Sequence, residues 1–208
     1  MAPVYKLHYF NLRTRGEVIR WTLSLAGQEF EDHRVEFPDW PALKPTTPTG
    51  QLPYLEVDGK ALDQSVTIAR FVAREHGLAG KNNWESAQVD SLVDYLRDAA
   101  KGFEAYTTAF FTRDPKIEEV KTEFTTKSVV PFLEGLERKL QSNDSGKGYF
   151  VGTTPTWGDL AAAHFLDEVV RLNPDALAKT PLLKAHNQRV HELKGIKEWL
   201  AKRPETPL

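Results

Sequence analysis

The stretch from Gly50 to Ser65 constrains the fold most, because it predicts two paired strands and the start of a helix within one short segment. Asp58 and Gly59 lie between two runs of apolar residues. This dipeptide is typical of a type I′ hairpin turn, in which both central residues need positive φ. Pro53 opens the first strand, where its missing N–H breaks no ladder, and its X-Pro bond can be cis.

The residues after the hairpin predict a helix N-terminus. Gln64 and Ser65 precede a helical run in which Ile68, Phe71 and Val72 share one face. Free N–H groups beside a serine hydroxyl favour an anion. An extended backbone edge next to such a site would suit a short peptide with a free carboxylate. A plain hairpin followed by a helix explains the same residues, and from this segment alone we favour that interpretation.

The chain before the hairpin predicts a βαβ unit. A strand over Val4–Phe10, a helix from Glu17 to Gly27 and a strand over Phe30–Val35 follow in order, and such strands pair in parallel. The segment Phe37–Thr49 contains four prolines and predicts a loop with little regular structure.

Strand signals disappear after the hairpin and its helix. Helical patterns cover Ala87–Phe111, Ile117–Leu140 with a kink at Pro131, a run to Leu172 that opens with a Thr156–Asp159 capping box, Pro181–Leu193 and Ile196–Lys202. We therefore expect an α/β domain over residues 2–80, in the order βαβ-ββα, and an all-α domain over 82–208.

Composition excludes several functional classes. Lys and Arg number 27 against 29 Asp and Glu, so no basic excess predicts nucleic-acid binding. No apolar run is long enough to span a bilayer, and the first residues lack a signal-peptide core, so we expect a cytoplasmic protein without membrane partners. The chain has no cysteine, so any thiol chemistry needs a thiol from a ligand. The histidines show no ligand spacing, and we expect no metal.

Five segments together resemble the cytosolic glutathione transferases, most closely the sigma class with its nematode members and haematopoietic prostaglandin D synthase. The segments are KLHYFNLRTRGE, DWPALK, GQLPYLEVDG, LDQSVTIARFVAR and WLAKRPETPL. The resemblance covers the chain from end to end. It implies a thioredoxin-like domain followed by a helical domain, a homodimer, and glutathione as co-substrate. The implied activity is conjugation of the glutathione thiolate to small hydrophobic electrophiles, as in detoxification.

The resemblance assigns the chemistry to Tyr9, whose hydroxyl would stabilise the glutathione thiolate, with Arg15 as the nearby cation. A free thiol has a pKa of about 8.5, so roughly 3% is thiolate at neutral pH. Lowering that pKa by about two units needs about 2.7 kcal/mol, and one hydrogen bond to a charged acceptor supplies about 1.5–3 kcal/mol. Without the resemblance, Tyr9 would be interpreted as a core aromatic residue.

The same resemblance assigns the remaining glutathione contacts. Trp40 and Lys44 would hold the glycyl end. Leu52, with its neighbour Gln51, would bind the backbone of the cysteinyl part. Gln64 and Ser65 would hold the γ-glutamyl carboxylate. Asp98 would reach the γ-glutamyl amine of the partner subunit's glutathione. Taken alone, Trp40 is more often a packing residue and Lys44 a solvated one. Gln51 can equally be an exposed turn residue, Gln64 and Ser65 a simple helix cap, and Asp98 part of a solvated acidic face. The electrophile site would be lined by Phe10, Leu12, Arg15, Tyr106, Phe110 and Leu208.

Three positions depart from the family pattern. Thr14 stands where relatives commonly have glycine, which should narrow the sulfur site or change the turn. Relatives in the prostaglandin D synthase branch carry a tryptophan near the position of Ala105 and an acidic residue near that of Arg97, and this chain lacks both. Two other functions remain as alternatives: a carrier of apolar ligands such as haem or a crystallin-like structural protein, and a glutathione-dependent prostaglandin isomerase.

Overall fold

The computed structural model describes residues 3–208, so the expected domain start at residue 2 lies outside the described residues. Two compact units are present. The first comprises the chain up to Leu78 together with Leu193–Leu208, and the second comprises Ala79–Glu192. The first unit's N-terminal part ends at Leu78, and the expected domain boundary at residues 80–82 stays a prediction. The last residues, which we expected in the all-α domain, pack instead with the first unit.

The first unit is a four-stranded sheet with helices. Its strands are β1 (Tyr5–Phe10), β2 (Phe30–Val35), β3 (Tyr54–Val57) and β4 (Lys60–Asp63), in the spatial order β2-β1-β3-β4. As predicted, β1 and β2 are parallel, and β3 and β4 form a hairpin. Asp58 and Gly59 have φ of 50° and 77°, which fits the expected type I′ turn.

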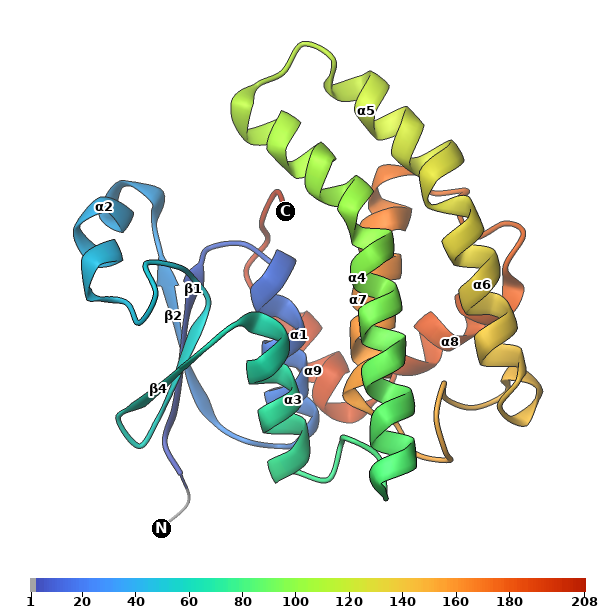
Figure 1. The fold of residues 1–208 in the computed structure, drawn as a ribbon, viewed down its shortest axis with the longest axis horizontal. Coiled ribbons are helices and arrows are strands. Elements are labelled where there is room, and N and C mark those ends of the chain that lie inside the picture. The colour runs from blue at the N-terminus through green and yellow to red at the C-terminus, as the bar shows by residue number, and fades with distance from the viewer. Residues whose placement is uncertain (1–2) are drawn as a thin grey trace. The chain divides into compact units, whose positions relative to one another are not determined.

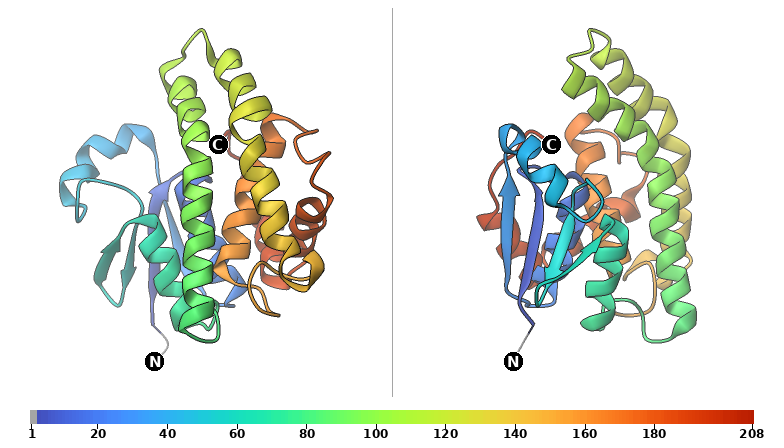
Figure 2. Two further views of the ribbon diagram at one scale, coloured as in Figure 1. Left: turned by 45° about the vertical axis from the view of Figure 1, so that its right-hand side comes forward. Right: turned by 60° about the vertical axis from the view of Figure 1, so that its left-hand side comes forward.

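Two helices pack on the same side of this sheet, α1 (Thr14–Leu25) and α3 (Ser65–Glu75), as Figure 2 shows. Alternation along β1 directs every second side chain towards them, and Leu7 is fully buried there. Ile19 of α1 and Ile68 of α3 are also fully buried. The βαβ-ββα order therefore has one apolar core between the sheet and its two helices.

The C-terminal helix α9 (Lys194–Lys202) belongs to this unit and packs on α1. The two backbones approach closely, because a Cβ built on Gly195 would overlap the carbonyl of Ser24. Any larger residue at 195 would separate the helices. Glycine is thus required by the packing.

The segment Phe37–Thr49 is more regular than we predicted. It forms a 3-10 turn at Phe37–Asp39, the short helix α2 (Trp40–Leu43) and another 3-10 turn at Lys44–Thr46. Proline is tolerated in the first turn of a helix, where its missing N–H has no intrahelical partner. Each of these three elements carries its proline at that position. In Figure 1 this segment lies beyond the carboxyl ends of β1 and β2.

The second unit is helical within its described residues. Its α-helices are α4 (Asn83–Thr112), α5 (Ile117–Glu123), α6 (Val130–Gln141), α7 (Trp157–Leu172) and α8 (Pro181–His191). In Figure 1, α4 lies beside α7. The predicted helix over 117–140 is interrupted by a π-helical turn at Phe124–Ser128. Pro131 explains this break, because its ring would clash with the carbonyl four residues earlier in a continuous α-helix.

The predicted capping box at the start of α7 is confirmed. The carboxylate of Asp159 accepts hydrogen bonds from the backbone N–H and the hydroxyl of Thr156, both at 2.8 Å. It also accepts from the Phe150 backbone N–H at 2.8 Å and lies 2.9 Å from His186 Nε2. One buried carboxylate therefore joins the start of α7 to the preceding loop and to α8.

Candidate active site

Tyr9 lies near the end of β1, and its side chain faces the helices with 5% of its surface exposed. Its hydroxyl is 2.6 Å from the Thr14 hydroxyl. The backbone N–H of Arg15 also donates to it. Burial raises the pKa of the Tyr9 hydroxyl, against the opposing effects of Thr14, Arg15 and Arg20. The Tyr9 phenol thus keeps its proton at physiological pH.

The turn between β1 and α1 is held by residues far along the chain. The backbone N–H of Arg13 donates to the Leu208 carbonyl at 2.6 Å, and its guanidinium donates to the Thr206 carbonyl at 2.9 Å. From α1, Arg20 Nη1 donates to the Leu12 carbonyl at 2.7 Å. Leu208 is fully buried, so it gives this turn a carbonyl oxygen and not an exposed apolar surface.

A buried carboxylate beneath this turn was not predicted from the sequence. Glu17 Oε1 accepts from the indole N–H of Trp21 at 3.0 Å, that of Trp199 at 2.9 Å, and Arg203 Nη1 at 2.7 Å. Its other oxygen lies 3.3 Å from Arg20 Nη1. The one sequence signal was the spacing of Glu17 and Trp21, which are four residues apart on one helix face.

Arg20 extends this network towards Tyr9. Its guanidinium is fully buried, pairs with Asp32 at 2.9 Å, and its central carbon lies 5.8 Å from the centroid of the Tyr9 ring. A buried cation at this distance favours negative charge on the ring oxygen. Arg20, together with Arg15, is therefore one of two guanidiniums acting on Tyr9.

The entry to the hairpin adjoins the end of β1. The antiparallel register pairs His8 with Tyr54, so Pro53 and Leu52 follow beside the last residues of β1. The Leu52–Pro53 bond is cis. This arrangement leaves the expected cysteinyl contact, Leu52, next to the strand that carries Tyr9, with Gln51 preceding it.

The start of α3 has an unusual backbone. Gln64 precedes the helix with φ 68° and ψ 109°, a conformation that L residues rarely adopt. Within the described residues its side chain makes no capping hydrogen bond to the helix. Gln64 is nevertheless the N-cap residue by position, because its carbonyl accepts from the Ile68 N–H at 2.9 Å. The first N–H groups of α3 and the hydroxyl of Ser65 remain as groups that an anion would bind.

Trp40 and Lys44 come from the segment around α2. The Phe10 ring packs edge-on against Trp40 at 5.4 Å and stacks on Phe37 at 4.9 Å. Lys44 is exposed, and its Cε lies 3.7 Å from a Cβ built on Gly50, next to the hairpin entry. These contacts join the α2 segment to both the end of β1 and the residue before Gln51.

The candidates in the helical unit all lie on α4. Asp98 is 61% exposed in its side chain and pairs with Lys101 at 2.7 Å, which lowers the pKa of the Asp98 carboxyl. Tyr106 is buried beside Phe103, with ring centroids 6.0 Å apart. Phe110 packs edge-on against Phe111 at 5.5 Å. The exposed Asp98 thus fits a polar contact, and the buried Tyr106 fits a residue that lines an apolar site.

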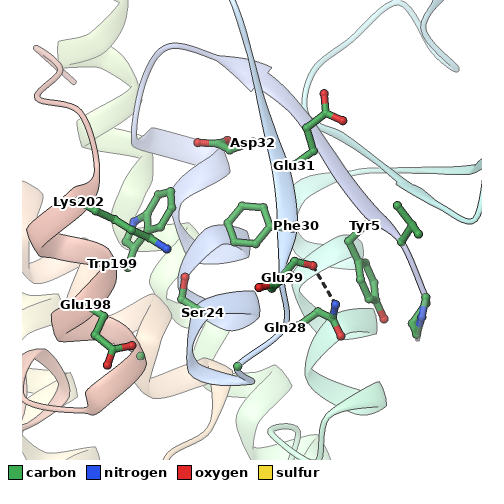
Figure 3. Close-up of a pocket in the computed structure, with 14 residues that line it drawn as sticks. Tyr5, Ser24, Gln28, Glu29, Phe30, Glu31, Asp32, Glu198, Trp199 and Lys202 are labelled. Atoms are coloured by element: carbon green, nitrogen blue, oxygen red, sulfur yellow. Dashed lines mark hydrogen bonds between the residues drawn. The ribbon is translucent and has the colours of Figure 1, made fainter. Parts of the chain in front are cut away.

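A groove of about 870 Å³ lies between β2 and α9 (Figure 3). Its lining includes Phe30 and Trp199, whose rings lie 5.7 Å apart, together with Glu29, Glu198 and Lys202. None of the residues expected to bind glutathione lines it. Across residues 3–208, no group of three or more histidines and carboxylates is placed to hold a metal ion, and no helix is long and apolar enough to cross a membrane.

Comparison with known proteins identifies the family. The glutathione S-transferase N-terminal domain matches residues 5–74, and the glutathione S-transferase C-terminal domain matches residues 102–203. The chain is 42% identical over 207 residues to probable glutathione S-transferase 8 of Caenorhabditis elegans, covering 97% of this chain and 98% of that protein. This chain belongs to the glutathione S-transferase family. The transferase is also 39% identical to haematopoietic prostaglandin D synthase of Gallus gallus, over 99% of this chain and all of that protein.

Solved structures agree with this assignment. The crystal structure of a major nematode-specific transferase of C. elegans superposes with a TM-score of 0.91 at 42% identity, covering 99% of this chain and 100% of that one. Rat haematopoietic prostaglandin D synthase in complex with a quinoline gives 0.85 at 35% identity, covering 99% and 100%. The predicted thioredoxin-like domain and helical domain are confirmed, and the transferase is of the sigma-like and nu-like type.

Proposed function

We propose that this transferase conjugates glutathione to small apolar electrophiles in the cytoplasm, with Tyr9 donating a hydrogen bond to the glutathione thiolate. The observation that carries the proposal is a neutral, buried Tyr9 hydroxyl at the carboxyl end of β1. A tyrosine with a raised pKa keeps its proton, so it acts as a hydrogen-bond donor and not as a general base. One such bond supplies most of the roughly 2.7 kcal/mol needed to make the bound thiol largely thiolate.

Glutathione would bind along the hairpin entry. Leu52 would pair its backbone with the cysteinyl part, as an added strand does. The γ-glutamyl carboxylate would meet Ser65 and the free N–H groups of α3, with Gln64 beside them. Lys44 supplies an exposed cation near Gly50 for the glycyl carboxylate, and Trp40 supplies an indole N–H.

The γ-glutamyl amine would be bound by Asp98 of the partner subunit in a homodimer. Asp98 now pairs with Lys101 on an exposed helix face. Exposed ion pairs contribute little to stability, so exchanging Lys101 for a ligand ammonium costs little. Apolar surface for the electrophile would come from Phe10 and Leu12 and, on α4, from Tyr106 and Phe110, with Arg15 beside the sulfur.

The test compares wild type with Tyr9→Phe in conjugation of a chloronitrobenzene. Removing the hydroxyl should lower kcat/KM by tenfold or more at neutral pH, because the hydrogen bond to a charged acceptor is worth about 1.5–3 kcal/mol. The pKa of the bound thiol, followed by thiolate absorbance in the ultraviolet, should rise in parallel. Equal rates and equal thiol pKa values in both proteins would refute the role of Tyr9.

A prostaglandin isomerase is the second candidate, because relatives named as prostaglandin D synthases are 39% and 35% identical to this chain. Ala105 and Arg97 depart from the pattern of that branch, so conjugation is favoured. Product analysis after incubation with prostaglandin H and glutathione separates the two activities. The relatives are named as transferases, so the comparisons do not favour a carrier or structural role over that of a transferase.

A further inference from the structure

Thr14 contributes a hydroxyl group to the surroundings of the candidate catalytic tyrosine. Its Oγ1 lies 2.6 Å from the Tyr9 hydroxyl. Thr14 is the first residue of α1 and has a φ of 22°, outside the regions that a β-branched residue normally adopts. A strained threonine that contacts a buried hydroxyl at hydrogen-bond distance suggests a function for its side chain.

The hydrogen-bonding capacity of the Tyr9 oxygen gives the direction of this contact. A phenolic hydroxyl has one proton and accepts from its oxygen lone pairs. The backbone N–H of Arg15 already donates to this oxygen. If Thr14 donates as well, the Tyr9 proton is left to point at a third group. In the opposite direction, Tyr9 would give its only proton to Thr14 and none would remain for a sulfur ligand.

The surrounding turn holds Thr14 in place. On its amino side, the Arg13 carbonyl accepts from the N–H groups of Gly16 at 3.1 Å and Glu17 at 2.9 Å, and the Arg13 N–H donates to Leu208. A Cβ built on Gly16 would overlap the Tyr9 ring, so this residue packs directly on the tyrosine. Thr14 is therefore held between Arg13, fixed by backbone hydrogen bonds, and Gly16, packed on the Tyr9 ring.

We propose that Thr14 is a positioning residue that donates its hydroxyl proton to the Tyr9 oxygen and so strengthens Tyr9 as the donor to the glutathione thiolate. The inference rests on the proposed role of Tyr9. Hydrogen bonds in series polarise one another, and a donor to the Tyr9 oxygen makes its remaining O–H more acidic. The chain thus supplies two donors to one hydroxyl, the Arg15 N–H and the Thr14 hydroxyl.

The experiment measures the pKa of enzyme-bound glutathione by thiolate absorbance in wild type, Thr14→Val and Thr14→Ser. Valine keeps the shape of threonine but removes the hydroxyl, whereas serine keeps the hydroxyl. The thiol pKa should rise by about 0.3–1 unit in Thr14→Val, with about a two- to tenfold loss of kcat/KM below that pKa. Thr14→Ser should restore the wild-type value. A thiol pKa that falls or stays the same in Thr14→Val overturns the proposal.

Two further variants make the result decisive. Thr14→Gly relieves the positive φ and removes the hydroxyl together, so it should show the same raised thiol pKa if the hydroxyl matters, even where valine impairs folding. Tyr9→Phe separates this proposal from the preceding one. If Tyr9→Phe raises the thiol pKa but Thr14→Val does not, only the role of Thr14 fails. If Tyr9→Phe leaves the thiol pKa unchanged, the role of Tyr9 fails. If Thr14 acts through Tyr9, adding Thr14→Val to Tyr9→Phe should cause no further change in the thiol pKa.

Discussion

Replacing Glu17 by glutamine tests whether a single buried carboxylate holds the C-terminal segment on the first unit. Its Oε1 accepts three hydrogen bonds, from Trp21, Trp199 and Arg203 at 2.7–3.0 Å, and its side chain is 1% exposed. Hydrogen bonds to charged groups contribute about 1.5–3 kcal/mol each, against about 0.5–1.5 kcal/mol for neutral ones. The amide also places N–H groups near Arg20, which itself only donates.

We therefore expect Glu17→Gln to lower the free energy of unfolding by about 2–4 kcal/mol, an estimate that allows about 1 kcal/mol for each weakened bond. Urea unfolding at one fixed protein concentration measures this change. Limited proteolysis should also cut near Leu193–Leu208 faster in the variant, because Trp199 and Arg203 lose their shared acceptor.

The matched control is Glu29→Gln, the same chemical change at an exposed carboxylate. Surface substitutions of this kind change stability by about 0.5 kcal/mol or less. A Glu17→Gln protein as stable as the Glu29→Gln protein would refute the argument that Glu17 anchors the segment.

Two further predictions concern the shared site and the sheet. Mixing Asp98→Asn subunits with Ser65→Ala subunits should give heterodimers that recover one wild-type glutathione site. If Ser65 and Asp98 of different subunits form one site, both substitutions fall in the same site of the heterodimer and leave the other site intact. A mixture without any high-affinity site would contradict sharing across the dimer. Burial lowers the pKa of His8, and the nearby His33 and Lys6 lower it further. The Glu56 carboxylate, 2.8 Å from the imidazole, raises this pKa but does not outweigh the burial. Since the unfolded chain then binds a proton more readily, stability should be complete above the ordinary histidine pKa of about 6.5 and fall as the pH drops below it. His8→Phe should flatten this part of the stability profile measured by urea unfolding, and an unchanged profile would exclude His8 as its origin.

Much of the fold could be predicted because it depends on local patterns. The Asp58-Gly59 turn needs positive φ at two neighbouring residues, which that dipeptide provides. The capping box of Thr156 and Asp159 involves residues three apart. The parallel pairing of β1 and β2 follows from a strand, a helix and a strand in succession.

Part of the candidate site was also visible before the structure, through the family resemblance. The motifs were enough to place Tyr9 at the end of a strand and Ser65 at the start of a helix, and to predict their roles. Their surroundings could not. Thr14 was expected only to narrow the site or change the turn, and its hydrogen bond to Tyr9 depends on a positive φ that a threonine does not predict.

The tertiary structure alone decided where the chain's last residues belong. The helical pattern of α9 was correctly predicted, but its placement against α1 was not. Glu17 meets Trp199 across 182 residues of chain and Arg203 across 186. Such a contact depends on the path of the whole backbone, whereas sequence patterns record only which residues share a local face. The sequence by itself thus determined the elements and their order, and the folded chain decided which distant residues share one buried carboxylate.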